Sequence, residues 1–356
     1  MKTKKLRYIL NVYNSIYNYK KNRVHLSSKP NLVWIEPTNI CNLRCPMCPA
    51  THNKNIPHGF MSFSLFKKIV DEISDSIVDC YLFLGGEALL HKEIIKMVRY
   101  LKKKNICVLM DTNGTLLTKE LAGELIAAGL DFVSFSFDGY DKKTYESIRI
   151  NASFDETLNN IITLLKLKQE LKKNNPYVRI RTIEDSVKKG AFSKEKKESF
   201  IRNFAGLHVE EFSAIQVGNW LGYVGQIPQY EIPPPQKIDT ASPRFSPCPQ
   251  LWTALSIRWN GEVSPCCIDI SNSMPLGNVK EKSIMQIWNG EPIKKLREAH
   301  LKKDLSRLSA CSYCGTPVAG KKLGIPVSAF SGISSALRMV LGFKLYRKIS
   351  KAFHPS

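Results

Sequence analysis

The sequence lacks the features that mark secreted, membrane-spanning and repetitive proteins. It has no internal repeat, and its basic first residues are followed by no apolar core or small-residue cleavage site, which makes a poor secretory signal. Residues 324–343 contain a proline and four serines and do not resemble a membrane-spanning helix. Without export the ten cysteines stay reduced, so metal ligation explains them better than disulfides. The expected location is the cytoplasm.

Acidic residues are missing from both ends of the chain. Residues 1–29 hold eight Lys and Arg, residues 316–356 hold seven, and neither segment has an Asp or Glu. The ends therefore carry 15 of the net charge of +21, which leaves only +6 for residues 30–315. Nucleic acid is the first partner that such a basic protein suggests, but the nearly balanced middle of the chain disfavours it.

Both basic ends also have apolar residues at helical spacing. The N-terminal set is Leu6, Ile9, Leu10, Tyr13, Ile16 and Tyr17, and the C-terminal set is Leu337, Val340, Leu341, Leu345, Ile349 and Phe353. Such helices can lie on an anionic membrane surface, which would place the protein peripherally on the inner membrane face. They can equally pack on the body of the protein with their lysines solvated.

Short apolar segments alternate with amphipathic segments between the two ends. Strands are predicted at 32–36, 81–84, 107–110, 132–137, 178–183 and 209–217, and helices at 62–76, 92–104, 118–128, 154–174 and 193–205. Six such units predict a parallel sheet with helices outside it, and they fall short of the eight units of a closed barrel. The expected fold is α/β, a partial (β/α)6 barrel with active residues at the carboxyl ends of its strands.

The pattern changes after the sixth unit. Prolines dominate residues 218–247, which predicts a linker, and residues 248–315 form a small cysteine-rich α+β module. The module has a predicted hairpin that turns at Asn260 and Gly261, and a predicted helix at 283–300. The domains are then a basic segment at 1–29, the barrel at 30–217, the linker, the module, and a basic tail at 316–356.

Three cysteines follow the first predicted strand. Cys41, Cys45 and Cys48 have the spacing C-x3-C-x2-C. Three thiolates can hold three irons of a [4Fe–4S] cluster and leave the fourth iron open, whereas a cluster that only transfers electrons has four cysteine ligands. An open iron is a Lewis acid that an amine and a carboxylate can chelate. Zinc is the alternative, although its ligands usually come as two pairs.

This spacing, with Met47 before the last cysteine, resembles the radical S-adenosylmethionine (SAM) superfamily. Four further motifs occur in the order that the family has them: Leu84–Leu90 (LGGEALL), Thr112–Gly114 (TNG), Ser136–Gly139 (SFDG) and Tyr145–Arg149 (YESIR). Each motif is weak alone, and their order carries the resemblance. Ala88 departs from the proline that usually ends the family's G-G-E-P motif.

The resemblance implies which residues bind SAM. Backbone atoms of Gly85 and Gly86 would contact its amino group, and Glu87 would support that loop. Ser136 would lie near the ribose, and the forked guanidinium of Arg149 could pair with the carboxylate. Met47 and Asn113 complete the expected SAM site. The alternatives are strand-exit turns for Asn113 and Ser136, and a structural ion pair for Glu87 and Arg149.

A second group of cysteines lies in the C-terminal module. Cys248, Cys266, Cys311 and Cys314, with Gly261 five residues before Cys266, resemble the twitch form of the SPASM module of radical SAM enzymes. This resemblance implies an auxiliary [4Fe–4S] cluster on these four thiolates. A structural zinc site is the alternative.

The other cysteines and one acid have separate expectations. Cys80 and Cys107 have apolar neighbours and are predicted core residues. Cys267 and Asp269 are the candidate catalytic residues, Cys267 as a hydrogen-atom donor such as radical epimerases use and Asp269 as an acid or base. The alternatives are a core cysteine and a turn or cap residue.

The resemblance implies an enzyme that reductively cleaves SAM at the first cluster and abstracts a hydrogen atom from a substrate, while the auxiliary cluster accepts an electron. An electron donor such as flavodoxin or ferredoxin would serve it. The four-cysteine arrangement resembles that of an aminocyclitol dehydrogenase, so oxidation or epimerisation of a sugar-like or polyol substrate is expected, lipid-linked if the ends touch a membrane.

Two other functions remain open from the sequence. One is a peptide-modifying maturase with a separate recognition partner, because about thirty residues before the first strand are too few for a leader-binding domain. The other is a non-catalytic iron–sulfur electron carrier, which would not cleave SAM.

Overall fold

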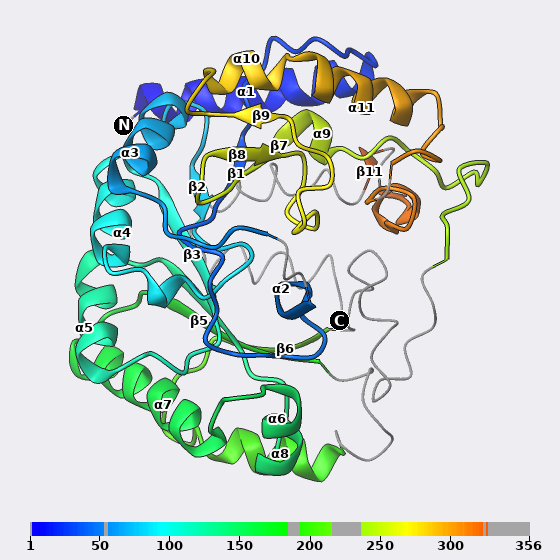
Figure 1. Ribbon diagram of the computed structural model, residues 1–356. Coiled ribbons are helices and arrows are strands. Elements are labelled where there is room, and N and C mark those ends of the chain that lie inside the picture. Colours follow the sequence, from blue (N-terminus) through cyan, green and yellow to red (C-terminus); the bar gives the residue numbers. More distant parts are fainter. Residues whose placement is uncertain are drawn as a thin grey trace.

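Six parallel strands form a curved, open barrel in the computed structural model, which describes residues 2–52, 56–183, 193–215, 236–308, 310–322 and 325–326 (Figure 1). The strands lie side by side in chain order. They are β1 (Leu32–Ile35), β2 (Asp79–Tyr81), β3 (Cys107–Thr112), β4 (Phe132–Ser136), β5 (Tyr177–Ile183) and β6 (Glu211–Ile215). The predicted partial (β/α)6 barrel is confirmed.

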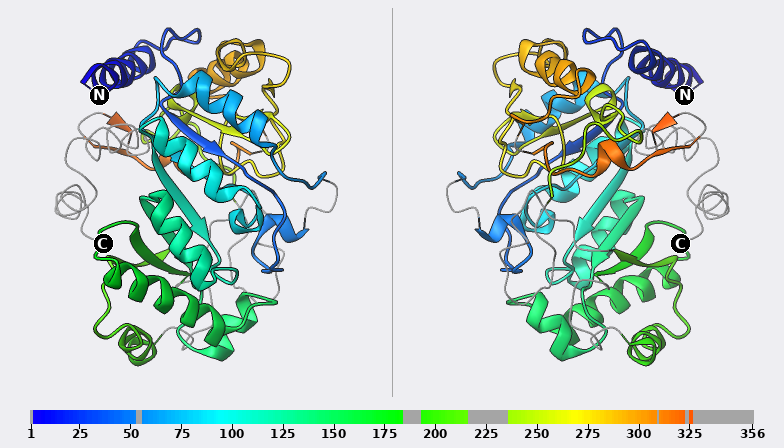
Figure 2. Two further views of the ribbon diagram at one scale, coloured as in Figure 1. Left: turned by 90° about the vertical axis from the view of Figure 1, so that its left-hand side faces the viewer. Right: turned by 90° about the vertical axis from the view of Figure 1, so that its right-hand side faces the viewer.

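Helices cover the outer face of this sheet (Figures 1 and 2). They are α3 (Phe63–Ile73), α4 (Ile94–Lys103), α5 (Lys119–Ala128), α6 (Lys142–Ile148), α7 (Phe154–Glu170) and α8 (Lys194–Arg202). Four of them begin after a Ser or Thr whose side chain accepts a hydrogen bond from the first turn, namely Ser62, Thr118, Ser153 and Ser193. Their apolar stripes pack on the strands in one continuous core.

Some boundaries differ from the sequence prediction. The second strand covers Asp79–Tyr81 rather than 81–84, because the chain leaves the sheet early and turns toward the double glycine. The short helix α6 was not predicted, and α7 ends at Glu170, before the predicted end at 174. The last two residues of the predicted strand 209–217 lie outside the described residues.

The C-terminal module continues the same sheet. β7 (Ala254–Ile257) pairs in parallel with β1, and β8 (Glu262–Ser264) and β9 (Gly277–Asn278) follow in antiparallel. The predicted hairpin is confirmed. The predicted helix at 283–300 is instead two helices, α10 (Ile284–Trp288) and α11 (Glu291–Leu301). Gly290 is extended and caps α11, and Pro292 in the first turn of α11 cannot continue a preceding helix.

Short elements complete the described chain. α2 (Pro49–His52) follows the first cysteines, and α9 (Gln250–Thr253) precedes β7. Single 3-10 turns cover Ala88–Leu90 and Thr316–Val318, and β10 (Lys321–Lys322) pairs with β11 (Ile325–Pro326). The described portion of the predicted linker, 236–247, has no helix or strand.

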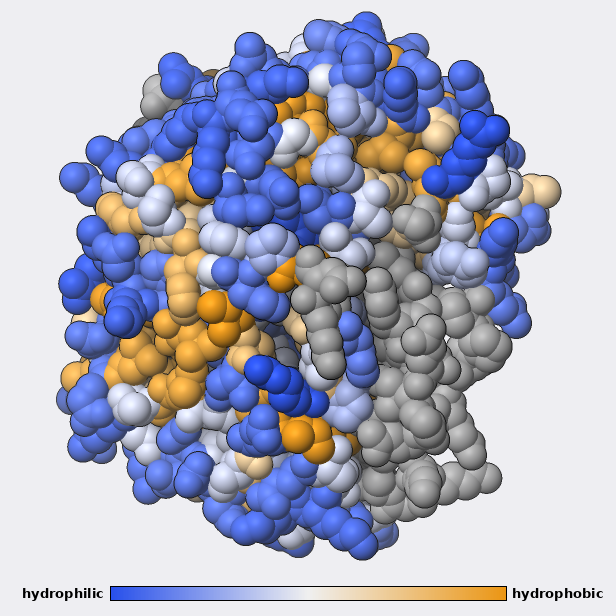
Figure 3. Space-filling view, in the orientation of Figure 1, coloured by the Kyte–Doolittle hydropathy of each residue, from blue (hydrophilic) through white to orange (hydrophobic). Residues whose placement is uncertain are grey.

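Hydrophilic residues cover most of the outer edge of the face shown in Figure 3, and hydrophobic residues gather left of its centre.

The N-terminal helix α1 (Lys2–Lys20) lies against the amino ends of the strands, far from α2, the helix that follows the first cysteines (Figure 1). Its packed face holds Tyr8 and Val12, which contact Val78, and Ser15, which accepts a hydrogen bond from Asn31. Most of the apolar stripe found in the sequence faces outward, whereas Ile16 packs against Tyr8, Val12 and Val78. The stripe members Leu6, Ile9, Leu10, Tyr13 and Tyr17 are between 39% and 63% exposed.

The predicted helix near residues 336–353 lies outside the described residues. Within the ranges that the structure describes, no helix has both the length and the apolar composition needed to cross a bilayer.

Arg297 of α11 joins the N-terminal segment to the module. Its Nε donates to the carbonyl oxygen of Leu251 (2.8 Å), and its Nη1 donates to those of Val24 (2.8 Å) and Trp288 (3.0 Å). The side chain is completely buried, and its guanidinium lies 4.5 Å from the centre of the Trp288 ring. One cation therefore satisfies three buried carbonyls from three segments.

Replacing this cation tests its structural importance. We expect Arg297→Leu to lower the free energy of unfolding by about 2–4 kcal/mol, because three buried carbonyls lose their donor. Urea denaturation followed by circular dichroism measures the change. Lys295→Leu, on the exposed face of the same helix, should change stability by less than about 0.5 kcal/mol. Equal stability of the two variants would contradict this account.

Candidate active site

A cavity of about 690 Å³ opens at the carboxyl ends of the barrel strands. Parallel strands direct their following loops to one edge, which is where the fold was expected to place its active residues. The residues expected to hold the first cluster and SAM all line this cavity: Cys41, Cys45, Met47, Cys48, Gly85, Gly86, Glu87, Asn113, Ser136 and Arg149. The structure therefore brings together residues that lie more than a hundred positions apart.

The cysteine loop is held by backbone and side-chain contacts. The Cys48 amide donates to the Cys45 carbonyl (3.0 Å), and Arg44 closes the loop by donating to the carbonyls of Cys41 and Leu43, both at 2.8 Å. Burial raises the pKa of the Cys41 thiol to about 11 and also raises the pKa values of Cys45 and Cys48. The thiols therefore keep their protons until a metal displaces them, and three thiols that line one cavity fit an iron–sulfur cluster.

Two buried carboxylates connect the surrounding loops. Glu87 accepts hydrogen bonds from the Thr112 hydroxyl (2.7 Å) and the Asn113 amide (2.8 Å), which ties the second loop to the third. Glu36, at the end of β1, accepts from the amides of Gly85 (3.0 Å) and Trp259 (3.2 Å). Burial raises the pKa of both carboxyl groups. Both acids therefore position the loops around the cavity.

Gly86 lies against the backbone of the cysteine loop. A Cβ atom on it would lie only 2.5 Å from the Ile40 carbonyl oxygen and 2.6 Å from that of Thr38. Glycine is required here because of this close approach, rather than by a left-handed conformation. Ala88 occupies the position where the family usually has proline. It begins a 3-10 turn in which the Glu87 side chain accepts a hydrogen bond from the Leu89 backbone amide (3.1 Å).

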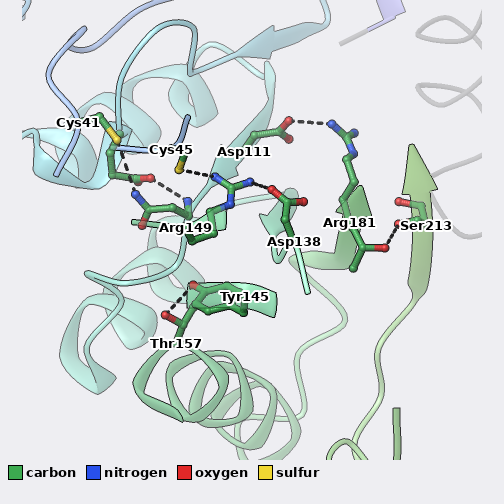
Figure 4. Close-up of polar contacts among 12 residues, drawn as sticks. Cys41, Cys45, Asp111, Asp138, Tyr145, Arg149, Thr157, Arg181 and Ser213 are labelled. Atoms are coloured by element: carbon green, nitrogen blue, oxygen red, sulfur yellow. Dashed lines mark hydrogen bonds and ion pairs between the residues drawn. The ribbon is translucent and has the colours of Figure 1, made fainter. Parts of the chain in front are cut away.

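Asn113 and Arg149 both reach the cysteine loop. The side-chain nitrogen of Asn113, Nδ2, donates to the side-chain oxygen of Asn42 (3.0 Å) and lies 3.9 Å from the Cys41 sulfur. Arg149 lies between Cys45 and Asp138 (Figure 4), with its Nη1 3.7 Å from the Cys45 sulfur and its Nη2 paired with the Asp138 carboxylate. Burial lowers the pKa of Arg149, but the Asp138 charge outweighs it and the net shift is upward. The guanidinium therefore stays charged beside the cluster site.

A charged wall of the same cavity was not predicted from the sequence. Arg181 on β5 pairs with Asp111 on β3 at 3.3 Å (Figure 4). Arg179 lies 3.8 Å from the same carboxylate. Asp111 and Arg181 line the cavity. The signal was present in the sequence, since charged residues interrupt otherwise apolar strands, and a buried sheet tolerates them only on a face that lines a cavity.

The C-terminal cysteines surround a second, smaller cavity of about 30 Å³. Cys248 precedes α9, Cys266 follows β8, and Cys311 and Cys314 lie in the segment after α11. Burial raises the pKa of Cys248, and raises that of Cys311 to about 12. In the described ranges, no three His, Cys, Asp or Glu side chains converge at the spacing of a single metal ion. Four half-buried thiols around one space are a donor set that fits a cluster.

The candidate catalytic residues Cys267 and Asp269 do not line the large cavity. Cys267 does not line the small cavity either. Asp269 lines the small cavity, and its oxygens accept from the amides of Ser273 (2.8 Å) and Met274 (3.0 Å) and from the Ser273 hydroxyl (2.9 Å). These are the contacts of a turn residue. Cys80 is completely buried, as predicted, and Cys107 is half-buried against an apolar cluster.

Comparison with protein families gives two matches. Residues 35–187 match the model of the radical SAM superfamily, and residues 248–315 match SPASM, an iron–sulfur cluster-binding domain. The two matched segments contain the two cysteine groups. These families bind SAM and [4Fe–4S] clusters, and the second match favours a cluster over zinc at the C-terminal cysteines.

Similar curated proteins cover the chain to different extents. The AdoMet-dependent heme synthase of Methanosarcina barkeri is 30% identical over 173 residues, which are 48% of this chain and 49% of that protein. The tungsten-containing aldehyde ferredoxin oxidoreductase cofactor-modifying protein of Pyrococcus furiosus is 26% identical over 300 residues, 73% of this chain and 81% of that one. The chain thus spans about half the length of the first of these relatives.

Two solved structures share the fold. SuiB of Streptococcus suis, bound to the precursor peptide SuiA, has a TM-score of 0.60 at 16% identity and covers 81% of this chain and 70% of its own. BtrN in complex with AdoMet and 2-DOIA has a TM-score of 0.53 at 15% identity and covers 85% and 97%. At these identities the likeness shows a common fold.

The contact of Gly86 with the cysteine loop can be tested with a matched pair of alanine variants. We expect Gly86→Ala to lower the free energy of unfolding by about 1–3 kcal/mol and to weaken SAM binding, because the new methyl group displaces the loop. Gly123→Ala, in α5, meets no atom within 4 Å and should be neutral or stabilising. Denaturation and calorimetry measure both. Unchanged SAM affinity in Gly86→Ala would refute this role for the close approach.

Proposed function

Because this chain carries a radical SAM domain and a C-terminal SPASM domain, we propose that it is an oxidoreductase that cleaves SAM and abstracts a hydrogen atom from a polar substrate. The observation that supports this most directly is the large cavity, whose one wall holds three thiols and whose other wall holds the Asp111–Arg181 pair. When bound, the first cluster would supply the electron that breaks the C5′–S bond of SAM, and the auxiliary cluster would accept the electron that the substrate gives up.

The chain's own residues would bind and orient the reactants. Cys41, Cys45 and Cys48 would hold the first cluster, and Cys248, Cys266, Cys311 and Cys314 the second. Backbone groups near Gly85 and Gly86, kept in place by Glu36 and Glu87, would contact the SAM amino group. Arg149, charged and beside Cys45, would attract the SAM carboxylate, and Ser136 would lie near the ribose. Met47 and Asn113 would complete this wall.

The charged wall supports a sugar-like or polyol substrate. A carboxylate and a guanidinium side by side offer an acceptor and several donors, which suits neighbouring hydroxyl groups. Oxidation of such an alcohol to a ketone removes one hydrogen atom, one electron and one proton. Asp111, held by Arg179 and Arg181, is the carboxylate in this wall that could take the proton. Epimerisation would instead return a hydrogen atom. Cys267, the candidate donor, does not line the large cavity, which favours oxidation.

A peptide substrate is the alternative, since a structure with this fold binds a precursor peptide. Candidate substrates deuterated at carbon distinguish the two classes. Deuterium in 5′-deoxyadenosine from a polyol supports the proposal, and deuterium from a peptide alone would replace it. Asp111→Asn should abolish turnover of a polyol while leaving SAM binding intact.

The proposed chemistry predicts a metal content and a product. After anaerobic reconstitution with iron and sulfide, the protein should hold about eight irons and, with SAM and dithionite, produce 5′-deoxyadenosine. Cys45→Ala should keep about four irons and lose the product. Cys107→Ala, which lies outside both cavities, should behave like the parent protein. Intact clusters with neither SAM binding nor cleavage would leave an electron carrier as the better reading.

We also propose that α1 contacts an anionic membrane surface. Its outward face combines Leu6, Leu10, Tyr13 and Tyr17 with exposed Arg7 and Lys20. The exposed Arg23 follows just after the helix, and the first 29 residues have no acid. Apolar and tyrosine side chains with flanking cations are what an interfacial helix needs. Because α1 covers the amino ends of the strands, it gives no support to a lipid-linked substrate, which would have to reach the opposite end.

Vesicle sedimentation tests this contact. The protein should bind vesicles that contain phosphatidylglycerol better than pure phosphatidylcholine vesicles, and added salt should weaken the binding. Replacing Leu10 and Tyr13 with Gln should reduce binding at least tenfold, since burial of each side chain contributes about 1.5–3 kcal/mol. Leu171→Gln, an exposed apolar residue after α7, is the matched control. Equal binding to both vesicle types would contradict an electrostatic contribution.

A further inference from the structure

His300 lies at the auxiliary-cluster cavity without an assigned function. It is in the last turn of α11, its side chain is completely buried, and its ring lines the cavity together with the four cysteines. A buried histidine beside four thiols is either a packing residue or a group that interacts with what the thiols hold. The hydrogen bonds of its two ring nitrogens distinguish these possibilities.

The first nitrogen fixes the position of the ring proton. The backbone amide of Cys248 donates to His300 Nδ1 at 3.3 Å. A backbone N–H can only donate, so Nδ1 carries no proton and the ring is neutral with its single proton on Nε2. This assignment follows from the donor alone.

The second nitrogen is a buried donor without an acceptor. Among the residues that the structure describes, Nε2 has no hydrogen-bond partner. An unsatisfied buried donor is destabilising, so this one requires an explanation. Asp269, the carboxylate at this cavity, already accepts from Ser273 and Met274. Gln250 Oε1 is a second buried atom without a partner at the same cavity and is the competing acceptor.

We propose that the Nε2–H group of His300 donates a hydrogen bond to a sulfur of the auxiliary cluster held by Cys248, Cys266, Cys311 and Cys314, and so raises the reduction potential of that cluster. The inference rests on the proposed function only for the presence of the cluster. A donor aimed at sulfur draws negative charge from it and stabilises the reduced cluster, which has one more negative charge. His300 is thus a tuning residue that makes the auxiliary cluster a better electron acceptor.

The experiment isolates the auxiliary cluster in the full-length chain. Replacing Cys41, Cys45 and Cys48 with Ala removes the first cluster, and the potential of the remaining one is measured by titration followed by electron paramagnetic resonance. In this background His300→Leu should shift the potential downward, and His300→Gln, whose amide can donate from nearly the same place, should restore most of it. Gln250→Leu should leave the potential unchanged.

A second measurement needs no change at His300. Exchange of the protein into D2O should remove the hyperfine coupling of an exchangeable proton near the reduced cluster. The proposal is overturned if this coupling is absent while the cluster is intact, or if His300→Leu keeps the parent potential. A strong nitrogen coupling would instead make His300 a direct iron ligand. If the variant without Cys41, Cys45 and Cys48 binds zinc or no iron, the chain has no auxiliary cluster and the proposed function fails at that point. That result differs from an intact cluster whose potential does not depend on His300.

Discussion

Two buried carboxylates hold the site together. Glu36 accepts hydrogen bonds from backbone amides of the loop after β2 and of the C-terminal hairpin, and Glu87 accepts one from the loop after β3. The backbone amides of these loops have no acceptor in the sheet, and the two carboxylates supply one. The cysteine loop, the glycine loop and the auxiliary module therefore keep one arrangement, and the large cavity depends on it.

The barrel and the C-terminal module, which carry the two cysteine groups, are joined by direct contacts and are not two independent domains. β7 pairs directly with β1, the strand that leads into Cys41, and Arg297 connects α11 to carbonyls from three other segments. A module joined through the sheet keeps its position relative to the barrel. An electron leaving a substrate in the large cavity would then have an acceptor at a fixed place. His300 would set how readily that acceptor takes it.

The sequence predicted the barrel well because alternating apolar segments and capped helices are local signals. The β/α units and the hairpin at Gly261 follow from spacing and residue type. The split between α10 and α11 was missed because the Gly290–Pro292 break was read as part of one amphipathic pattern. The cysteine groups were found from spacing, but Asp111, Arg181 and His300 were not. Their meaning depends on neighbours far away in the chain, which periodicity cannot show.

The central claim is that three thiols hold a cluster whose fourth iron is open to SAM. Electron–nuclear double resonance on the reduced protein with SAM labelled by ¹⁵N at its amino group tests this most directly. The account predicts a ¹⁵N coupling large enough to require direct bonding to iron, and its loss in Cys45→Ala. A reduced first cluster whose spectrum does not respond to SAM would mean that its fourth iron is already occupied, and would contradict the account.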